Sequence, residues 1–170
     1  MAGTPGIVAS GHRETSQAAT AILAAGGNAF DAALGAACAA CVCEPMLTSL
    51  GGGGFLLARP AGRPPVLFDF FVQTPHRRRP EEELDFYPIL ADFGTARQEF
   101  HIGLGAMAVP GMVAGLFEAR EALGSLPMSE IVAPAVELAR RGVRVTAYQS
   151  WISRILEPIL RASPEATAVA

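Results

Sequence analysis

"TSLGGGGFLLARP", residues 48–60, places four consecutive glycines between apolar residues. A phosphate-binding Walker loop needs a Lys followed by Ser or Thr directly after its last glycine, whereas Gly54 is followed by Phe55. A dinucleotide-binding fingerprint that starts at Gly51 would need its last glycine where Leu56 stands. The run therefore indicates a tight turn or bulge at which another backbone comes close, rather than a phosphate cradle.

The residues that follow the glycines predict an antiparallel hairpin. The segments 54–60 ("GFLLARP") and 65–71 ("PVLFDFF") are short apolar runs typical of strands, and "AGRP" between them supplies the turn. Apolar runs also predict a strand over 6–10 ("GIVAS") and another over 104–110 ("LGAMAVP"), which ends at Pro110.

A first helix is predicted over residues 15–27. Thr15 or Ser16 can accept hydrogen bonds from its first N–H groups, and Gly26 with Gly27 supplies a left-handed C-terminal stop.

A second helix is predicted between Asn28 and Pro45. Asn28 is a good N-cap, and Asp31 places a carboxylate near the positive end of the helix. Small residues lie on nearly every side of this segment, which is typical of a helix that is packed closely all round.

The rest of the chain predicts one long loop and several helices. Residues 72–100 predict an irregular, solvated loop, in which a run of arginines and a run of glutamates compensate each other's charge. Helices are predicted over about 110–123 and over 126–142, the latter kinked or broken at Pro134. A short extended piece and another helix follow within 143–160. Residues 161–170, low in bulk, predict a disordered tail.

Composition and element order predict a single α+β domain, or a large part of one, over residues 1–170. The chain is 51% hydrophobic and 17% charged, and its formal net charge of −3 argues against a nucleic-acid or anionic membrane partner. No apolar run is long enough to predict a membrane span. Paired helices beside antiparallel strands favour a layered α+β fold.

Cys38, Cys41 and Cys43 have a spacing that resembles part of a metal site. No second Cys/His pair follows at a suitable distance, so we predict no metal and expect the thiols to pack as small apolar groups. Clustered thiols suit a reducing compartment, and the N-terminus resembles no signal peptide. We expect a cytoplasmic location, with a periplasmic or secreted one, through an undetected leader, as the alternative.

Several segments, in order, resemble the gamma-glutamyltranspeptidase family. They are "VAS", "GGNAFDAA", "EP" and "GGGGF", followed by "AVPGMVAGL" and "LPMSEIVAPAVELARRGVRV". The resemblance covers residues 6 to about 150, and several blocks in one order are more specific than any single motif. It identifies the glycine run with the turn through which the family's large subunit enters a core strand.

The resemblance implies an N-terminal-nucleophile hydrolase with a four-layer α-β-β-α sandwich, to which this chain contributes the N-terminal part of the large subunit. Members of the family cut themselves into a large and a small subunit. The new N-terminal Thr of the small subunit attacks a γ-glutamyl amide, and the acyl group passes to water or to an acceptor amine. The expected partner is therefore the small subunit. We assign no catalytic residue to this chain, and no cofactor is expected.

The family anchors its substrate through a motif Asp-Gly-Arg-Glu-Thr-Ala-Pro, whose Arg binds the α-carboxylate of the glutamyl group. The matching stretch here is "DFFVQTP", residues 69–75, with Phe71 at the Arg position. An aromatic ring cannot replace an Arg–carboxylate pair. We therefore predict Phe71, Gln73 and Arg77 as substrate-binding residues. Arg77 either replaces the family's Arg as the cation that binds the carboxylate or is simply an exposed surface charge.

These observations leave alternative functions open. The leading hypothesis is a γ-glutamyltransferase or glutathione-hydrolase-like enzyme. The second keeps the fold and nucleophile but takes another acyl amide, apolar or aromatic, because Phe70 and Phe71 can line an apolar pocket. The third is a non-catalytic homologue with a structural or binding role.

Overall fold

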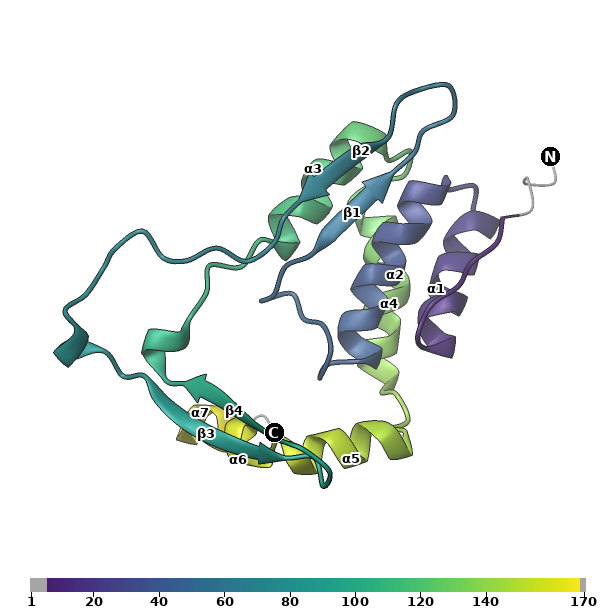
Figure 1. The fold of residues 1–170 in the computed structure, drawn as a ribbon. Helices are drawn as coiled ribbons and strands as arrows, with labels where there is room; N and C mark the ends of the chain where they lie inside the picture. The colour runs from purple at the N-terminus through teal and green to yellow at the C-terminus, as the bar shows by residue number, and fades with distance from the viewer. Residues whose placement is uncertain (1–5, 169–170) are drawn as a thin grey trace. The chain divides into compact units, whose positions relative to one another are not determined.

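Helix α2 (Ala29–Cys43) lies at the centre of the first of two units into which the chain divides. The computed structural model describes residues 6–168 (Figure 1). The first unit comprises Met1–Gln73 and Pro110–Arg144, and the second comprises Thr74–Val109 and Val145–Ala170. Both contain helices and strands, so the predicted α+β class is confirmed.

Helix α1 (Arg13–Ala24) begins earlier than predicted. His12 is its N-cap, and the Nδ1 atom of His12 accepts a hydrogen bond from the Glu14 N–H at 3.2 Å. Thr15 and Ser16 lie inside the helix, so their prediction as caps is wrong. The unprotonated nitrogen of a neutral imidazole can accept a hydrogen bond, and the extended backbone of His12 places this nitrogen beside the first N–H groups of the helix.

The start of α2 is as predicted. Gly26 has a φ of 94°, the left-handed conformation expected at the end of α1. The Asn28 side chain then accepts hydrogen bonds from the N–H groups of Phe30 and Asp31. The Asn28 N–H in turn donates to the Asp31 carboxylate at 2.9 Å, which completes a capping box.

Helices α3 (Met112–Leu123) and α4 (Met128–Arg141) complete the helical part of the first unit. Helix α4 runs through Pro134 without a break and ends before Gly142, which has a φ of 80°. Its last residue, Arg141, forms an ion pair with Glu14 of α1.

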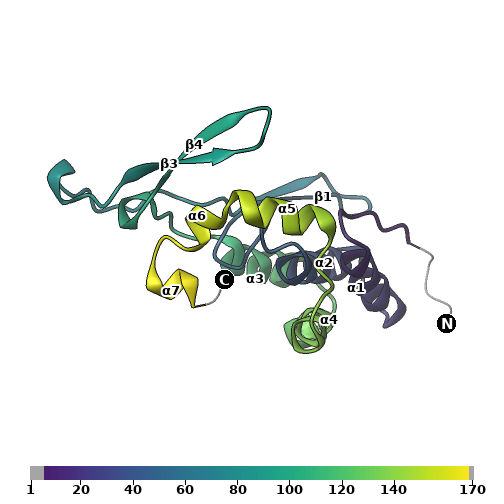
Figure 2. The ribbon, with the colours of Figure 1, turned by 90° about the horizontal axis from the view of Figure 1, so that it is seen from below.

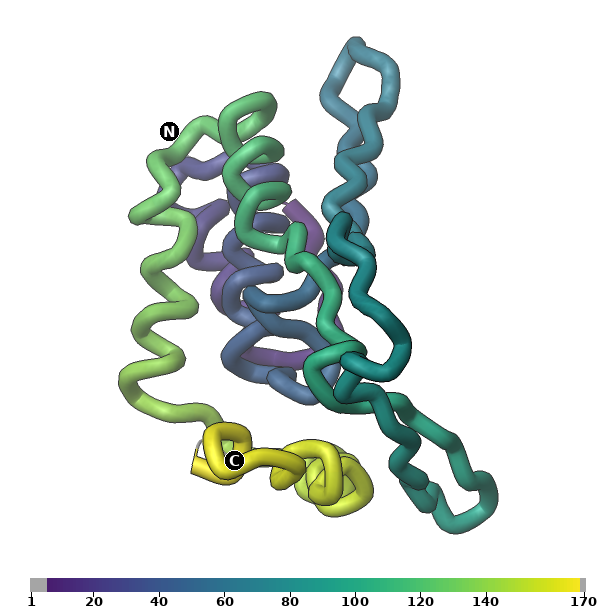
Figure 3. Tube along the Cα trace, turned by 90° about the vertical axis from the view of Figure 1, so that its left-hand side faces the viewer, coloured from purple at the N-terminus to yellow at the C-terminus, as the bar shows by residue number. Residues whose placement is uncertain are grey.

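Strands β1 (Phe55–Ala58) and β2 (Val66–Asp69) form the predicted antiparallel hairpin, with Leu57 opposite Leu67. The two turned views show this hairpin on one side of α2 and α4 on the other (Figures 2 and 3). Leu56 and Phe68 face the helices and pack against the core. The buried residues of this core are Ala18, Leu34, Cys38, Ala39, Cys43, Met112, Leu116, Ala119, Ile131, Ala135 and Leu138.

Asp31 ties the loop after α3 to the start of α2. Its buried carboxylate accepts hydrogen bonds from the Ser125 hydroxyl and from the N–H groups of Ser125 and Leu126. The Asn28 side-chain amide donates to the Leu123 carbonyl at 2.8 Å. Burial acts to raise the pKa of Asp31, but the hydrogen bonds from Ser125, Asn28 and Leu126 together hold this pKa below its usual value.

The second unit contains a hairpin where the sequence predicts an irregular loop over 72–100. Strands β3 (Tyr87–Asp92) and β4 (Arg97–Ile102) pair in antiparallel fashion. An Asp92 carboxylate oxygen accepts the Gly94 N–H at 2.8 Å, and Gly94 has a φ of 86°. The Asp-x-Gly turn therefore closes a hairpin. The sequence did not predict this hairpin, because the charged residues around it are typical of a solvated loop.

The strand predicted over 104–110 is also wrong, because this stretch begins with the 3-10 turn η2 (Leu104–Ala106). Asp85 accepts the Leu104 N–H with its side chain and the Gly105 N–H with its carbonyl. These donors are therefore not offered to a neighbouring strand.

Residues 6–10 form no strand in the part of the chain that the structure describes. Ile7 is fully exposed, and the Ser10 hydroxyl donates instead to the His12 carbonyl at the start of α1. No helix within residues 6–168 is long and apolar enough to cross a membrane.

The C-terminal segment of the second unit is helical. Helix α5 (Ala147–Ile155) starts with a capping box between Thr146 and Gln149, which satisfies N–H groups that have no partner within the helix. Two single turns follow, α6 (Glu157–Leu160) and α7 (Pro164–Thr167). The latter lies within the predicted tail, whose residues 169–170 are outside the described range. The turn η1 (Glu81–Glu83) completes the elements of this unit.

Changing Asp31 to Asn should lower the free energy of unfolding at pH 7 by about 2–3 kcal/mol, because buried donors lose a charged acceptor. The lowered pKa adds a pH dependence. The stabilisation that ionised Asp31 provides is present above the unfolded-state pKa of about 3.9. It is lost as the pH falls through the lower pKa that Asp31 has in the folded state. Urea unfolding of the full-length protein should therefore show the two proteins converging below about pH 4.

Glu118→Gln is the matched control, since Glu118 is exposed on α3. It should change the unfolding free energy by less than about 0.5 kcal/mol. If Asp31→Asn behaves like this control, the buried carboxylate is not what holds the loop.

Candidate functional site

The glycine run is joined to the start of α3. The Gly52 carbonyl accepts hydrogen bonds from the N–H groups of Gly111 and Met112, at 3.1 and 3.0 Å. The first N–H groups of a helix have no partner within it, so Gly52 satisfies two donors that would otherwise remain free.

Gly53 and Gly54 lie against the end of β2. Gly54 exchanges two backbone hydrogen bonds with Phe70, at 3.3 and 3.1 Å. A Cβ atom on Gly53 would lie 2.6 Å from both the Phe70 carbonyl oxygen and the Val72 nitrogen. The prediction of a close backbone approach is therefore confirmed, since no other residue fits at Gly53 without a shift of the chain.

Phe70 is fixed by glycines of α3 and its N-cap. A Cβ on Gly115 would lie 2.2 Å from the Phe70 ring, and one on Gly111 would lie 2.3 Å from the Phe70 carbonyl oxygen. The ring thus fills the space that Gly115 leaves, and it packs against the helical core. The backbone around Phe70 is held from both sides.

Phe71 has the opposite orientation to Phe70. Its N–H donates to an Asp69 carboxylate oxygen at 3.1 Å, and the residue is 50% exposed. It stacks on Phe55, with the ring centroids 5.4 Å apart and an interplanar angle of 10°. We call these two side chains the aromatic pair. It lies on the face of the β1–β2 hairpin that Leu57 and Leu67 share, away from the helices.

The other predicted substrate-binding residues, Gln73 and Arg77, are exposed. Phe71 and Gln73 belong to the first unit, and Arg77 belongs to the second. Among the described residues none forms an ion pair with Arg77. All three assignments stay predictions.

Phe55 is the residue of this site that the sequence did not single out. The signal was present in the strand alternation. Phe55 lies opposite Asp69 in the hairpin register, so a residue two positions beyond Asp69 emerges on the same face. The sequence predicts the hairpin, but not its register, and so the two rings were not paired.

The cysteines pack as predicted where they are buried. Cys38 and Cys43 lie in the helical core. Burial, with a smaller contribution from Cys41, raises the pKa of Cys38 to about 11, so this thiol is not ionised near neutral pH. Burial also raises the pKa of Cys41. Within residues 6–168 no group of His, Cys, Asp and Glu is arranged to hold a metal ion.

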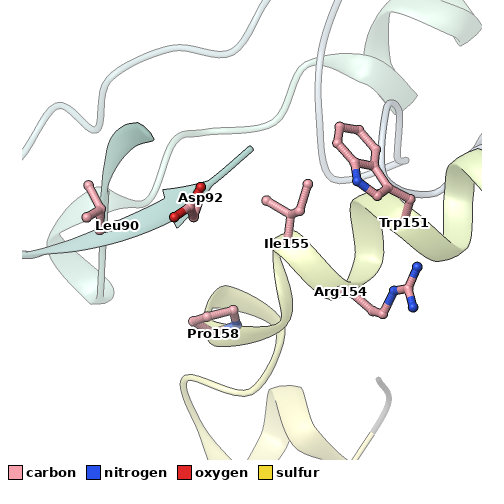
Figure 4. A pocket seen from close by; sticks show the side chains of 6 residues that line it. All are labelled: Leu90, Asp92, Trp151, Arg154, Ile155 and Pro158. Carbon is pink, nitrogen blue, oxygen red and sulfur yellow. The ribbon is translucent and has the colours of Figure 1, made fainter. Parts of the chain in front are cut away.

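The second unit has a shallow hollow of about 370 Å³ between β3 and the helices α5 and α6 (Figure 4). Trp151 and Arg154 of α5 border it, and Asp92 of β3 lies across from them. The Asp92 carboxylate is engaged by Arg97 and the Gly94 N–H. None of the predicted site residues lines this hollow.

The sequence profile of the Gamma-glutamyltranspeptidase family matches residues 15–169. The chain belongs to the gamma-glutamyltranspeptidase family. The glycine run and the aromatic pair therefore belong to a family member, and the predicted resemblance is confirmed.

Relatives with curated names include two proenzymes. The chain is 39% identical over 153 residues to the acylase ACY 1 proenzyme of Pseudomonas sp. strain V22, covering 87% of this chain and 27% of that protein. It is 36% identical over 145 residues to the glutathione hydrolase proenzyme of Pseudomonas aeruginosa, covering 85% of this chain and 25% of that protein. The chain thus spans about a quarter of these relatives' length.

The fold is also found among solved gamma-glutamyltranspeptidases. The Helicobacter pylori gamma-glutamyltranspeptidase matches with a TM-score of 0.77 at 24% identity, over 95% of this chain and 45% of that chain. At this identity the match supports the fold alone.

Within the glycine run, Gly53→Ala and Gly51→Ala should differ sharply. The Cβ of Ala at position 53 would collide with backbone atoms, at a cost of about 1–3 kcal/mol in unfolding free energy. At Gly51 the nearest atom is the Ser49 hydroxyl oxygen at 3.7 Å, an ordinary contact, so the change should be small. Urea unfolding of both full-length variants checks this, and equal losses would contradict it.

Proposed function

We propose that this chain is the N-terminal part of the large subunit of a self-processing amidohydrolase that cleaves or transfers a γ-glutamyl group. The observation that carries the proposal is the family match over residues 15–169. Relatives named as proenzymes support the self-processing step. The substrate would be a small-molecule amide.

In the proposed reaction, the nucleophile is the N-terminal Thr of a small subunit that is the partner of this chain. Its free α-amine takes the proton of its own hydroxyl, and the hydroxyl oxygen attacks the amide carbonyl. The amine leaves with a proton, and water or an acceptor amine then releases the acyl group from the Thr oxygen. No residue of this chain is assigned to these proton transfers.

The contribution of this chain is to hold the acyl group. We align the segment 69–75 with the family's substrate-anchoring motif, and the contacts of Gly53 and Phe70 hold its start in one conformation. A fixed segment loses little conformational entropy when a substrate binds, which favours affinity. Arg77 lies just after this segment. If the acyl group is γ-glutamyl, we propose that Arg77 binds its α-carboxylate.

A second candidate is the same reaction on an apolar acyl amide. The observation that favours it is the aromatic pair, since Phe71 stands at the family's Arg position with half of its surface exposed. A relative named as an acylase is compatible with a changed acyl group. The third hypothesis, a homologue without catalytic activity, would be supported if the tests below find neither cleavage nor turnover.

Intact mass and N-terminal sequencing of the purified full-length gene product test the proposal first. We expect two polypeptides, the smaller of which begins with Thr. Turnover of γ-glutamyl-p-nitroanilide should accompany cleavage if the γ-glutamyl form is correct. A single uncut chain without turnover would contradict an enzymatic role altogether.

Arg77→Ala should raise KM for γ-glutamyl-p-nitroanilide about tenfold, which corresponds to about 1.4 kcal/mol. The physical reason is the loss of charge-assisted hydrogen bonds to the α-carboxylate, so kcat should change little. Arg63→Ala is the matched control, because Arg63 is an exposed arginine in the β1–β2 turn. Equal KM values for the two variants would rule out Arg77 as the carboxylate partner.

A further inference from the structure

The Phe70 side chain lies against α3 at a point where only a glycine leaves room. A Cβ atom on Gly115 would lie 2.2 Å from the Cγ, 2.3 Å from the Cδ1 and 2.4 Å from the Cβ of Phe70. Rotation about the Cα–Cβ bond of Phe70 does not move its Cβ, so no rotamer of the ring relieves this contact. A side chain at position 115 would therefore shift the backbone of Phe70 or of α3.

The preference for glycine at position 115 does not come from the helix itself. Gly115 is a buried residue within α3, and glycine is a poor helix former compared with alanine. The physical reason for a glycine here is the fit with Phe70, which comes from the end of the β1–β2 hairpin. Gly115 and Phe70 thus form one steric unit, although they are distant in the sequence.

The main chain around Phe70 is also held by α3. A Cβ atom on Gly111, the N-cap of α3, would lie 2.3 Å from the Phe70 carbonyl oxygen and 3.1 Å from the Phe71 carbonyl oxygen. From the other side, Gly54 exchanges two backbone hydrogen bonds with Phe70. Because Phe71 follows directly in the chain, a shift of Phe70 is passed on to Phe71.

We propose that Phe70 is a positioning residue for the acyl group, because its fit against Gly115 sets the place of Phe71. Phe71 stands where the aligned family motif has the Arg that binds the substrate. The inference rests on the proposed function and applies to either acyl group. It adds Phe70 and Gly115 as residues that act on the substrate through Phe71. The contacts that carry it are internal to the first unit.

The expected kinetic effect follows from the division of labour in the proposed reaction. The nucleophile comes from the partner subunit, and this chain holds the acyl group. A displaced Phe71 would weaken the hold on that group in the substrate and in the transition state alike. Loss of such uniform binding raises KM and leaves kcat unchanged. A merely structural defect instead reduces the amount of folded enzyme, which lowers the apparent kcat and leaves KM unchanged.

Steady-state kinetics of the full-length protein test the inference. The substrates are γ-glutamyl-p-nitroanilide and phenylacetyl-p-nitroanilide. For whichever amide the unaltered protein cleaves, Gly115→Ala should raise KM about tenfold and keep kcat within about twofold. Phe70→Leu is a milder variant that remains informative if Gly115→Ala does not fold. It keeps an apolar side chain but loosens the fit, so KM should rise about threefold.

Ala119→Gly is the matched control. Ala119 is buried on α3 and lies four residues beyond Gly115. Its replacement by glycine weakens the same helix but adds no atom near Phe70. This variant should therefore keep the KM of the unaltered protein.

A double variant tests whether Phe70 and Gly115 act through one contact. Phe70→Gly removes the three atoms nearest to the Cβ that Gly115→Ala would add. Phe70→Gly alone should raise KM, because no ring holds the segment on α3. In that background Gly115→Ala should change KM by less than about twofold, since interacting residues are not additive.

The inference is overturned if neither Gly115→Ala nor Phe70→Leu raises KM. It is also overturned if Ala119→Gly raises KM equally, or if Gly115→Ala keeps its full effect in the Phe70→Gly background. Self-cleavage, read by mass in the same samples, reports separately on the proposed function. A cleaved, active protein with unchanged KM values refutes only the inference. An uncut, inactive protein refutes the proposed reaction and the inference with it.

Discussion

The close contact between the backbone of Gly53 and the end of β2 is the constraint on which the candidate site depends. At 2.6 Å from two backbone atoms, a Cβ at this position has no room. The neighbouring Gly52 carbonyl meets the start of α3, and Gly54 pairs with Phe70. One short segment without side chains thus joins a loop, a hairpin and a helix. That junction fixes the orientation of Phe70 and Phe71. Successive side chains of an extended chain point to opposite faces, so the Phe70 ring faces the helical core and the Phe71 ring faces away from it.

The Asp31 network supports the same unit from the other end of α2. A buried carboxylate is costly unless donors surround it, and here Ser125, Leu126 and Asn28 provide them. These donors come from both sequence segments of this unit, so the network fixes the connection between α3 and α4 relative to α2. Its energy is electrostatic, whereas the glycine junction depends on steric fit. The two constraints should therefore respond differently to pH.

Prediction from the sequence succeeded where local chemistry decides the structure. The N-cap at Asn28, the left-handed stop at Gly26 and the β1–β2 hairpin depend on residues close in the chain. It failed where a local signal was outweighed by context. The Asp-x-Gly turn at Gly94 lay inside a charged stretch, and the apolar run after Gly103 lost its N–H donors to Asp85. The predicted substrate-binding residues Phe71, Gln73 and Arg77 remain predictions.

The sequence by itself was sufficient for the family, the α+β class and a close backbone approach somewhere within residues 51–54, because glycine's missing side chain and ordered motifs are visible without coordinates. Only the tertiary structure decided which backbone approaches Gly53 and which ring accompanies Phe71. Those contacts join residues on different strands and helices. Their pairing depends on hairpin register and on how α3 packs, which no local pattern specifies.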